Sequence, residues 1–72
     1  MNKEKFLEEL AFALNRDEQI NESMMLKDLP EWDSLGIMCV VTLLEDTYQK
    51  SLTFDDLSKF NTVKDLVDAV ER

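Results

Sequence analysis

The stretch DSLGIMCVVTLLEDTY, residues 33–48, has the most regular hydrophobic pattern in the chain. Its apolar residues recur at the i, i+3, i+4, i+7 and i+11 positions, which share one side of an α-helix. These residues are Ile37, Val40, Val41, Leu44 and Tyr48. The pattern predicts a helix that begins at Leu35, ends near Gln49 and buries this side.

The opposite side of the same helix is only partly polar. It carries Leu35, Met38, Cys39, Thr42 and Asp46, with Leu43 and Glu45 at its margins. Single exposed apolar residues are ordinary on a protein surface. Two of them within one turn of Ser34 favour a contact site for another molecule.

Two further segments show helical periodicity, and a third is a short helix candidate. A first helix is expected over Lys3–Leu14, with Asn2 as its N-terminal cap. A short helix is expected over Phe54–Lys59, with Ser51 or Thr53 as its cap. A last helix opens at Asn61 or Thr62, where Thr62 and Asp65 resemble a capping box. The stripes expected to be buried are Phe6, Leu7, Leu10, Ala13 and Leu14 in the first helix and Val63, Leu66, Val67 and Val70 in the last.

Residues 15–33 form an unusually long connection for a small domain. A helical turn is expected around Glu22–Leu26, and Pro30 prevents a helix from continuing through it. The anchors expected to hold the connection against the helices are Ile20, Met25, Leu26 and Leu29. Phe12 falls outside the first stripe; packing beneath a loop is favoured over an exposed contact role.

These elements predict an all-α fold: a small four-helix bundle of three longer helices and one short helix, with a long loop between the first two. The length of 72 residues fits one domain, residues 1–72. The N-terminus is too charged for a signal peptide, and no apolar run approaches a membrane span. We therefore expect a cytoplasmic protein. We also expect it to be a monomer.

The charge balance excludes several classes of partner. With 16 Asp and Glu against 8 Lys and Arg, the net charge is −8. This argues against nucleic acid and against insertion into or binding to an anionic membrane. A basic protein surface is the natural complement; the alternative is that the charge serves only solubility.

The composition also argues against a self-contained enzyme. The chain has no His and one Cys, Cys39. It therefore lacks the commonest general base and metal ligand, and no metal site is expected. Cys39 is expected to be a small packing residue rather than a reactive thiol.

Ser34 has two interpretations on local chemistry. An Asp-Ser pair before a periodic helix is first of all a helix cap. A hydrolytic nucleophile is excluded because no His and no GxSxG motif are present. An attachment point requires only an exposed hydroxyl, and the start of a helix tolerates an anionic group.

Two neighbours of Ser34 also have alternatives. Glycine is unfavourable inside a helix, so Gly36 in the first helical turn calls for an explanation. Either a partner or a bound group approaches closely there, or the penalty is smaller in the first turn of the helix. Trp32 either anchors the loop or shields an attached group, and anchoring is favoured.

The whole chain resembles the acyl carrier protein family. The resemblance rests on "DSL" at 33–35, "LLEDTY" at the end of the central helix and the tail "LTFDDLSKFNTVKDLVDAV". In the tail, family-like positions hold Leu52, Asp55, Asp56, Phe60, Thr62, Val63, Val67 and Val70. The resemblance implies a four-helix bundle that carries covalent 4'-phosphopantetheine on Ser34.

The resemblance further implies a carrier rather than a catalyst. An acyl or aminoacyl cargo is held as a thioester on the arm, which a phosphopantetheinyl transferase installs. Partners are acyl-loading, condensing or acyl-transferring enzymes with basic docking patches. The matching docking positions are Asp33, Leu35, Met38, Cys39, Thr42, Glu45 and Asp46.

The pathway is less defined than the arm. Gly36 and Cys39 stand where carriers of fatty-acid synthesis often have Asp or Glu. The "LPEWDSLG" version looks more like dedicated carriers of specialised pathways, so fatty-acid, polyketide and other specialised biosynthesis stay open. The alternative function is an unmodified acidic helical interaction module that uses the Leu35/Met38 edge.

Overall fold

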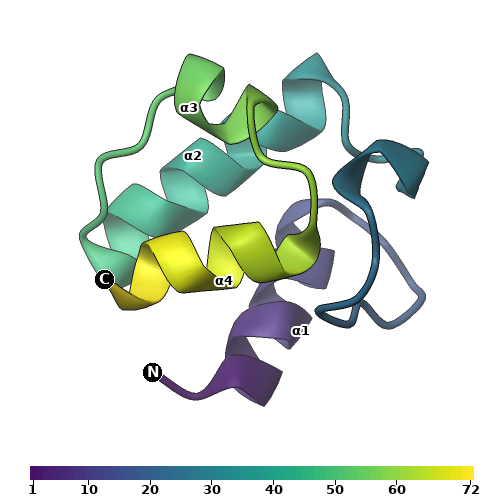
Figure 1. Cartoon of the computed structure of the whole chain (residues 1–72), viewed down its shortest axis with the longest axis horizontal. Helices are drawn as coiled ribbons and strands as arrows, with labels where there is room; N and C mark the ends of the chain where they lie inside the picture. Colours follow the sequence, from purple (N-terminus) through teal and green to yellow (C-terminus); the bar gives the residue numbers. More distant parts are fainter.

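Helix α2 (Ser34–Tyr48) is the element on which the other helices pack in the computed structural model, which describes residues 1–72. In Figure 1, α1 (Lys3–Ala13) and α3 (Phe54–Ser58) lie on opposite sides of the pair formed by α2 and α4 (Val63–Glu71). A 3-10 turn, η1 (Leu26–Asp28), interrupts the connection between α1 and α2. The predicted all-α bundle of three longer helices and one short helix is confirmed.

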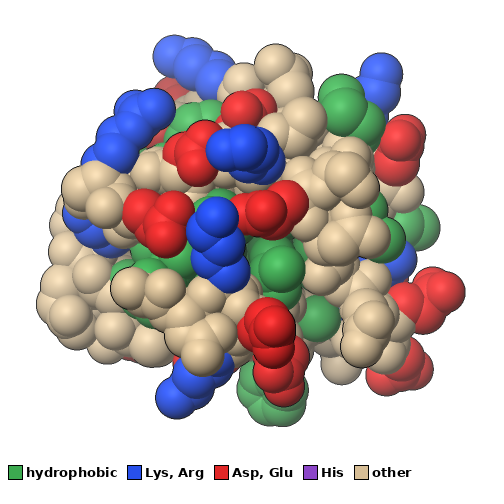
Figure 2. All heavy atoms as spheres, turned by 60° about the horizontal axis from the view of Figure 1, so that its bottom comes forward, with side chains coloured by type: hydrophobic (Ala, Val, Ile, Leu, Met, Phe, Trp, Pro, Cys, Tyr) green, Lys and Arg blue, Asp and Glu red, His purple; other side chains and the backbone are tan.

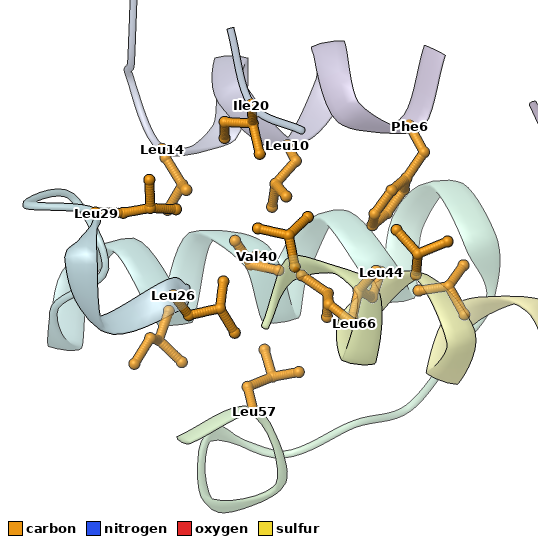
Figure 3. Close-up of a cluster of buried hydrophobic side chains, with 14 of the residues drawn as sticks. Phe6, Leu10, Leu14, Ile20, Leu26, Leu29, Val40, Leu44, Leu57 and Leu66 are labelled. Carbon is orange, nitrogen blue, oxygen red and sulfur yellow. The ribbon is translucent and has the colours of Figure 1, made fainter. Parts of the chain in front are cut away.

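One hydrophobic cluster joins all the helices. Figure 3 shows Phe6, Leu10 and Leu14 pointing from α1 toward α2, with Leu57 entering from the α3 side. Every periodic stripe supplies this cluster, although Leu7 and Tyr48 are only half-buried. The expectation that Ala13 is buried was wrong, because it is half-exposed and does not belong to the cluster or to the residues packed against it. The buried residues are Phe6, Leu10, Leu14, Ile20, Leu26, Leu29, Ile37, Val40, Val41, Leu44, Leu57, Val63, Leu66, Val67 and Val70.

Side-chain caps fix where the peripheral helices begin. The Asn2 side chain accepts a hydrogen bond from the Lys5 N–H, as predicted. Thr62 and Asp65 form the predicted capping box at the start of α4. Thr53 and Asp56 form a second box at α3, which settles the choice between Ser51 and Thr53. These caps satisfy N–H groups that have no partner within a helix.

The long connection is anchored largely as predicted. Ile20, Leu26 and Leu29 are buried, but Met25 does not join the core, and Met24 packs against it instead. The helical turn lies at η1 and not around Glu22–Leu26, so that expectation was wrong.

Backbone pairing with α4 explains the different position of the turn. Met25 forms an isolated antiparallel bridge with Thr62, so it is extended rather than helical. The Leu26 N–H donates to the Asn61 carbonyl (2.9 Å), and the Val63 N–H donates to the Met24 carbonyl (3.0 Å). The connection is thereby attached to the start of the last helix.

The expectation that Phe12 packs beneath a loop was wrong, because its side chain is 87% exposed. Helix α1 ends in a Schellman motif, with Asn15 in the left-handed region at φ 57°. The Asn15 N–H donates to the Phe12 carbonyl (3.0 Å), and the Arg16 N–H donates to the Ala11 carbonyl (2.9 Å). The following loop then buries Ile20 and leaves Phe12 uncovered.

Tyr48 closes the far end of the α1–α2 contact. Its ring stands edge-on to that of Phe6, with centroids 5.3 Å apart. Its hydroxyl donates to the carboxylate of Glu9. None of the helices is both long and apolar enough to cross a membrane.

Candidate functional site at the start of helix α2

Asp33, not Ser34, caps helix α2. Its backbone is extended, and its Oδ1 accepts a hydrogen bond from the Gly36 N–H at 2.9 Å. Its carbonyl accepts from the Ile37 N–H at 2.8 Å. The helix therefore begins at Ser34, one residue before the predicted Leu35, and the capping interpretation of Ser34 was wrong.

The hydroxyl of Ser34 therefore has no structural role in the fold. The side chain is exposed, and its Oγ makes no hydrogen bond within the chain. The backbone N–H groups of Ser34 and Leu35 lie in the first helical turn, so they have no helical acceptor. A phosphate group on the serine has donors and the positive end of the helix beside it. The carboxylate of Asp33 opposes this attraction.

Exposure alone does not single out Ser34, because the other serines are exposed too. The Ser23 hydroxyl, however, donates to Asn21 Oδ1 (2.6 Å), and the Ser58 hydroxyl donates to the Asp55 carbonyl (2.9 Å). Ser51 lies in the loop before α3, outside any helix. Only Ser34 combines an unbonded hydroxyl, a capped helix start and exposed apolar residues directly after it.

The outer side of α2 is exposed along its length. Leu35 is 76% and Met38 48% exposed. Thr42 is exposed, and its hydroxyl donates to the Met38 carbonyl (3.2 Å) within the helix. Each predicted docking residue thus lies at the surface, and the expected packing role of Cys39 was wrong. These exposed residues are Asp33, Leu35, Met38, Cys39, Thr42, Glu45 and Asp46.

Gly36 is required by the chain itself rather than by a visiting group. A Cβ at this position would stand 2.0 Å from the backbone oxygen of Glu31 and 3.0 Å from Leu14 Cδ2. The loop before Ser34 therefore packs directly on the helix backbone. Since Gly36 is buried, it is not available as a docking position.

An ion pair that the sequence did not reveal holds this loop. Arg16 Nη1 donates to Glu31 Oε1 at 3.0 Å, and the Arg16 side chain is only 11% exposed. The residues are 15 positions apart in the chain. Trp32, next to Glu31, is half-buried against the core, which supports its predicted anchoring role. Together these contacts fix the segment that presents Asp33 and Ser34.

Three comparisons with known proteins place this arrangement in context. The family model described as "Phosphopantetheine attachment site" matches residues 4–70, nearly the whole chain. The comparison with curated proteins and the comparison with solved structures each gave no match.

Proposed function

The chain belongs to the phosphopantetheine attachment site family, and we propose that Ser34 is the serine that bears its 4'-phosphopantetheine arm. The family attaches this group covalently to a serine, and its members are non-catalytic carriers that work with a phosphopantetheinyl transferase and biosynthetic enzymes. The observation that carries the proposal is the unbonded, exposed hydroxyl of Ser34 at the capped start of α2.

Attachment is a phosphoryl transfer from coenzyme A. The Ser34 oxygen forms a bond to the phosphorus next to the pantetheine arm, and the pyrophosphate bond breaks to release adenosine 3',5'-bisphosphate. The hydroxyl proton goes to a base of the transferase, because the Ser34 hydroxyl is hydrogen-bonded to no base of this chain. The arm, once bound, supplies a thiol that holds the cargo as a thioester.

The residues of this chain prepare the serine and the docking surface. Asp33 caps the helix and so leaves the Ser34 hydroxyl free. The exposed side chains of Leu35 and Met38 offer apolar contact area beside it, and Glu45 and Asp46 offer charge toward a basic patch. We propose that loading, condensing or acyl-transferring enzymes dock on this surface in fatty-acid, polyketide or other specialised biosynthesis.

We propose that the carrier works as a cytoplasmic monomer of one domain, residues 1–72. Its net charge of −8 disfavours contact between two copies. The acidic outer side of α2 also favours enzymes with basic surfaces.

The deciding experiment is intact-mass spectrometry after incubation with coenzyme A and a broad-specificity phosphopantetheinyl transferase. We expect the mass of one phosphopantetheine group to be gained by the wild type and by Ser58→Ala, and not by Ser34→Ala. Circular dichroism establishes that each variant is folded. A folded wild type without any mass gain would favour the unmodified interaction module, and a gain that persists in Ser34→Ala would place the arm elsewhere.

A further inference from the structure

Phe12 is the most exposed of the large hydrophobic side chains, at 87%. Its backbone carbonyl takes part in the turn that ends α1, but its side chain has no part in the core. An exposed phenylalanine presents a large apolar area to water. The fold therefore explains the backbone at position 12 and leaves the ring without a structural role.

Two hollows of the surface meet at this ring. One lies between α1 and the loop that follows it, where Leu7, Ala11 and Ile20 line its apolar part. The other lies between α1 and α2, where Ala13 and Leu43 line its apolar part beside Lys5, Glu8 and Glu9. Neither includes Ser34, Leu35 or Met38, so the Phe12 surface is distinct from the proposed docking surface around the serine.

Acidic side chains surround the first hollow. Glu4 and Glu8 precede Phe12 at four-residue intervals along one side of α1, and Asp17 and Glu18 follow it in the loop. The one basic residue in this lining, Arg16, is already paired with Glu31. Figure 2 shows one face of the molecule, on which acidic, basic and hydrophobic side chains are interspersed.

We propose that Phe12 is the anchor of a second docking surface, for a protein partner that offers an apolar pocket rimmed by Lys and Arg. Aromatic side chains, Phe among them, are enriched in the cores of protein interfaces, and complementary charges around such a contact speed encounter and select the partner. A second copy of this chain is the poorer fit, because it brings a net charge of −8 to the same acidic rim. The proposal goes beyond the attachment of the arm and does not depend on it.

The test begins with photo-crosslinking in the native host. The full chain carries benzoylphenylalanine in place of Phe12, and a matched chain carries it in place of Leu35. The protein captured at position 12 is identified by mass spectrometry and purified, and its affinity for the carrier is measured by calorimetry. We expect Phe12→Ala to weaken binding at least about tenfold, while Lys59→Ala, an exposed change at the end of α3, leaves it unchanged.

Charge and modification give independent readouts. We expect the Glu4→Gln/Glu8→Gln double variant to weaken binding and to flatten its dependence on salt. Because neither hollow includes Ser34, the wild type is expected to bind equally well with and without the arm. Phe12→Lys serves as a second substitution at the anchor, and thermal melting establishes that both Phe12 variants are folded.

Three results would overturn the proposal. These are capture of nothing at position 12 while position 35 captures a protein, capture of a second copy alone, and equal affinity of the wild type and both Phe12 variants. None of them bears on whether Ser34 is modified, which the mass measurement decides separately.

Discussion

The backbone oxygen of Glu31 occupies the space in which a side chain at Gly36 would begin, 2.0 Å from an ideal Cβ. The same oxygen accepts a hydrogen bond from the Asp33 N–H at 2.9 Å. One carbonyl thus touches the helix on one side and the capping residue on the other. The position of Ser34 depends on a contact that only glycine permits.

Gly36→Ala tests this contact, because the contact determines whether the substitution raises or lowers the free energy of unfolding. An alanine in a helix free of clashes would raise the free energy of unfolding by about 0.5–1 kcal/mol. Because the Glu31 carbonyl must move, we expect a decrease of about 1–3 kcal/mol instead. Urea unfolding followed by circular dichroism measures it, with Thr47→Ala on the exposed part of α2 as the control. An increase in stability would show that the loop yields without cost.

Arg16→Gln removes the cation that holds Glu31. Since the Arg16 side chain is 11% and that of Glu31 28% exposed, we expect a loss of about 1–3 kcal/mol in the free energy of unfolding. The control is Lys64→Gln, which breaks the exposed pair with Asp68 and should cost no more than about 0.5 kcal/mol. Equal losses in the two variants would contradict a special role for the Arg16 pair.

The same substitution should slow attachment of the arm. A loosened segment before Asp33 presents Ser34 in more than one geometry, so we expect a lower rate of mass gain with the transferase at a temperature where Arg16→Gln is folded. Lys64→Gln should react at the wild-type rate. An unchanged rate for Arg16→Gln would show that the Arg16–Glu31 ion pair contributes to stability and not to the presentation of Ser34.

Tyr48 is the only tyrosine, so its titration can be followed directly by absorbance. Burial, together with the hydrogen bond and the negative charge of Glu9, raises the pKa of Tyr48 from 10.0 to about 12. We expect Glu9→Gln to move the titration midpoint back toward 10.0. A midpoint that does not differ between the two proteins would exclude the Tyr48–Glu9 contact.

This shift also has a consequence for stability. A pKa that is higher in the folded state stabilises the fold below the unfolded value, and the stabilisation is lost as the pH rises from about 10 to 12. We expect the wild type to lose stability across this window more steeply than Tyr48→Phe does. Parallel pH profiles of the two proteins would argue against this linkage.

The capping boxes predict the opposite pH dependence at the acid end. The hydrogen bonds from Thr62 and Asn61 lower the pKa of Asp65, and those from Thr53 lower the pKa of Asp56. A group whose pKa is lowered in the folded state stabilises the fold at pH values above its unfolded pKa of 3.8. This stabilisation is lost as the pH falls through the folded pKa. We expect Asp65→Asn to melt below the wild type at pH 6 and close to it at pH 2, whereas Thr47→Ala, which changes no titratable group, keeps a constant offset.

Periodicity predicted what depends on local sequence. The stripes of α2 and α4, the Asn2 cap and the Thr62–Asp65 box were all identified, because each rests on residues within a few positions of one another. The four-helix architecture followed from them. The periodicity of α2 also placed Leu35 and Met38 on the outer side, where they are exposed.

Long-range contacts account for what was missed. Nothing local distinguishes Arg16 and Glu31 from other surface charges, and only the folded loop brings them together. Gly36 did signal a close approach, but the approaching group is the chain's own carbonyl. Phe12 and Cys39 were expected to pack, yet helical spacing says which side of a helix a residue occupies and not what covers that side.

The bridge between Met25 and Thr62 couples the connection before α2 to the start of α4, and this coupling should be visible in amide hydrogen exchange. The amides of Leu26, Val63 and Lys64 all donate across this junction. Opening it releases both the first turn of α4 and the segment that leads to Ser34, so the two should open as one cooperative unit. We therefore expect the last helix, remote from Ser34 in sequence, to govern how long the proposed attachment serine stays ordered between openings.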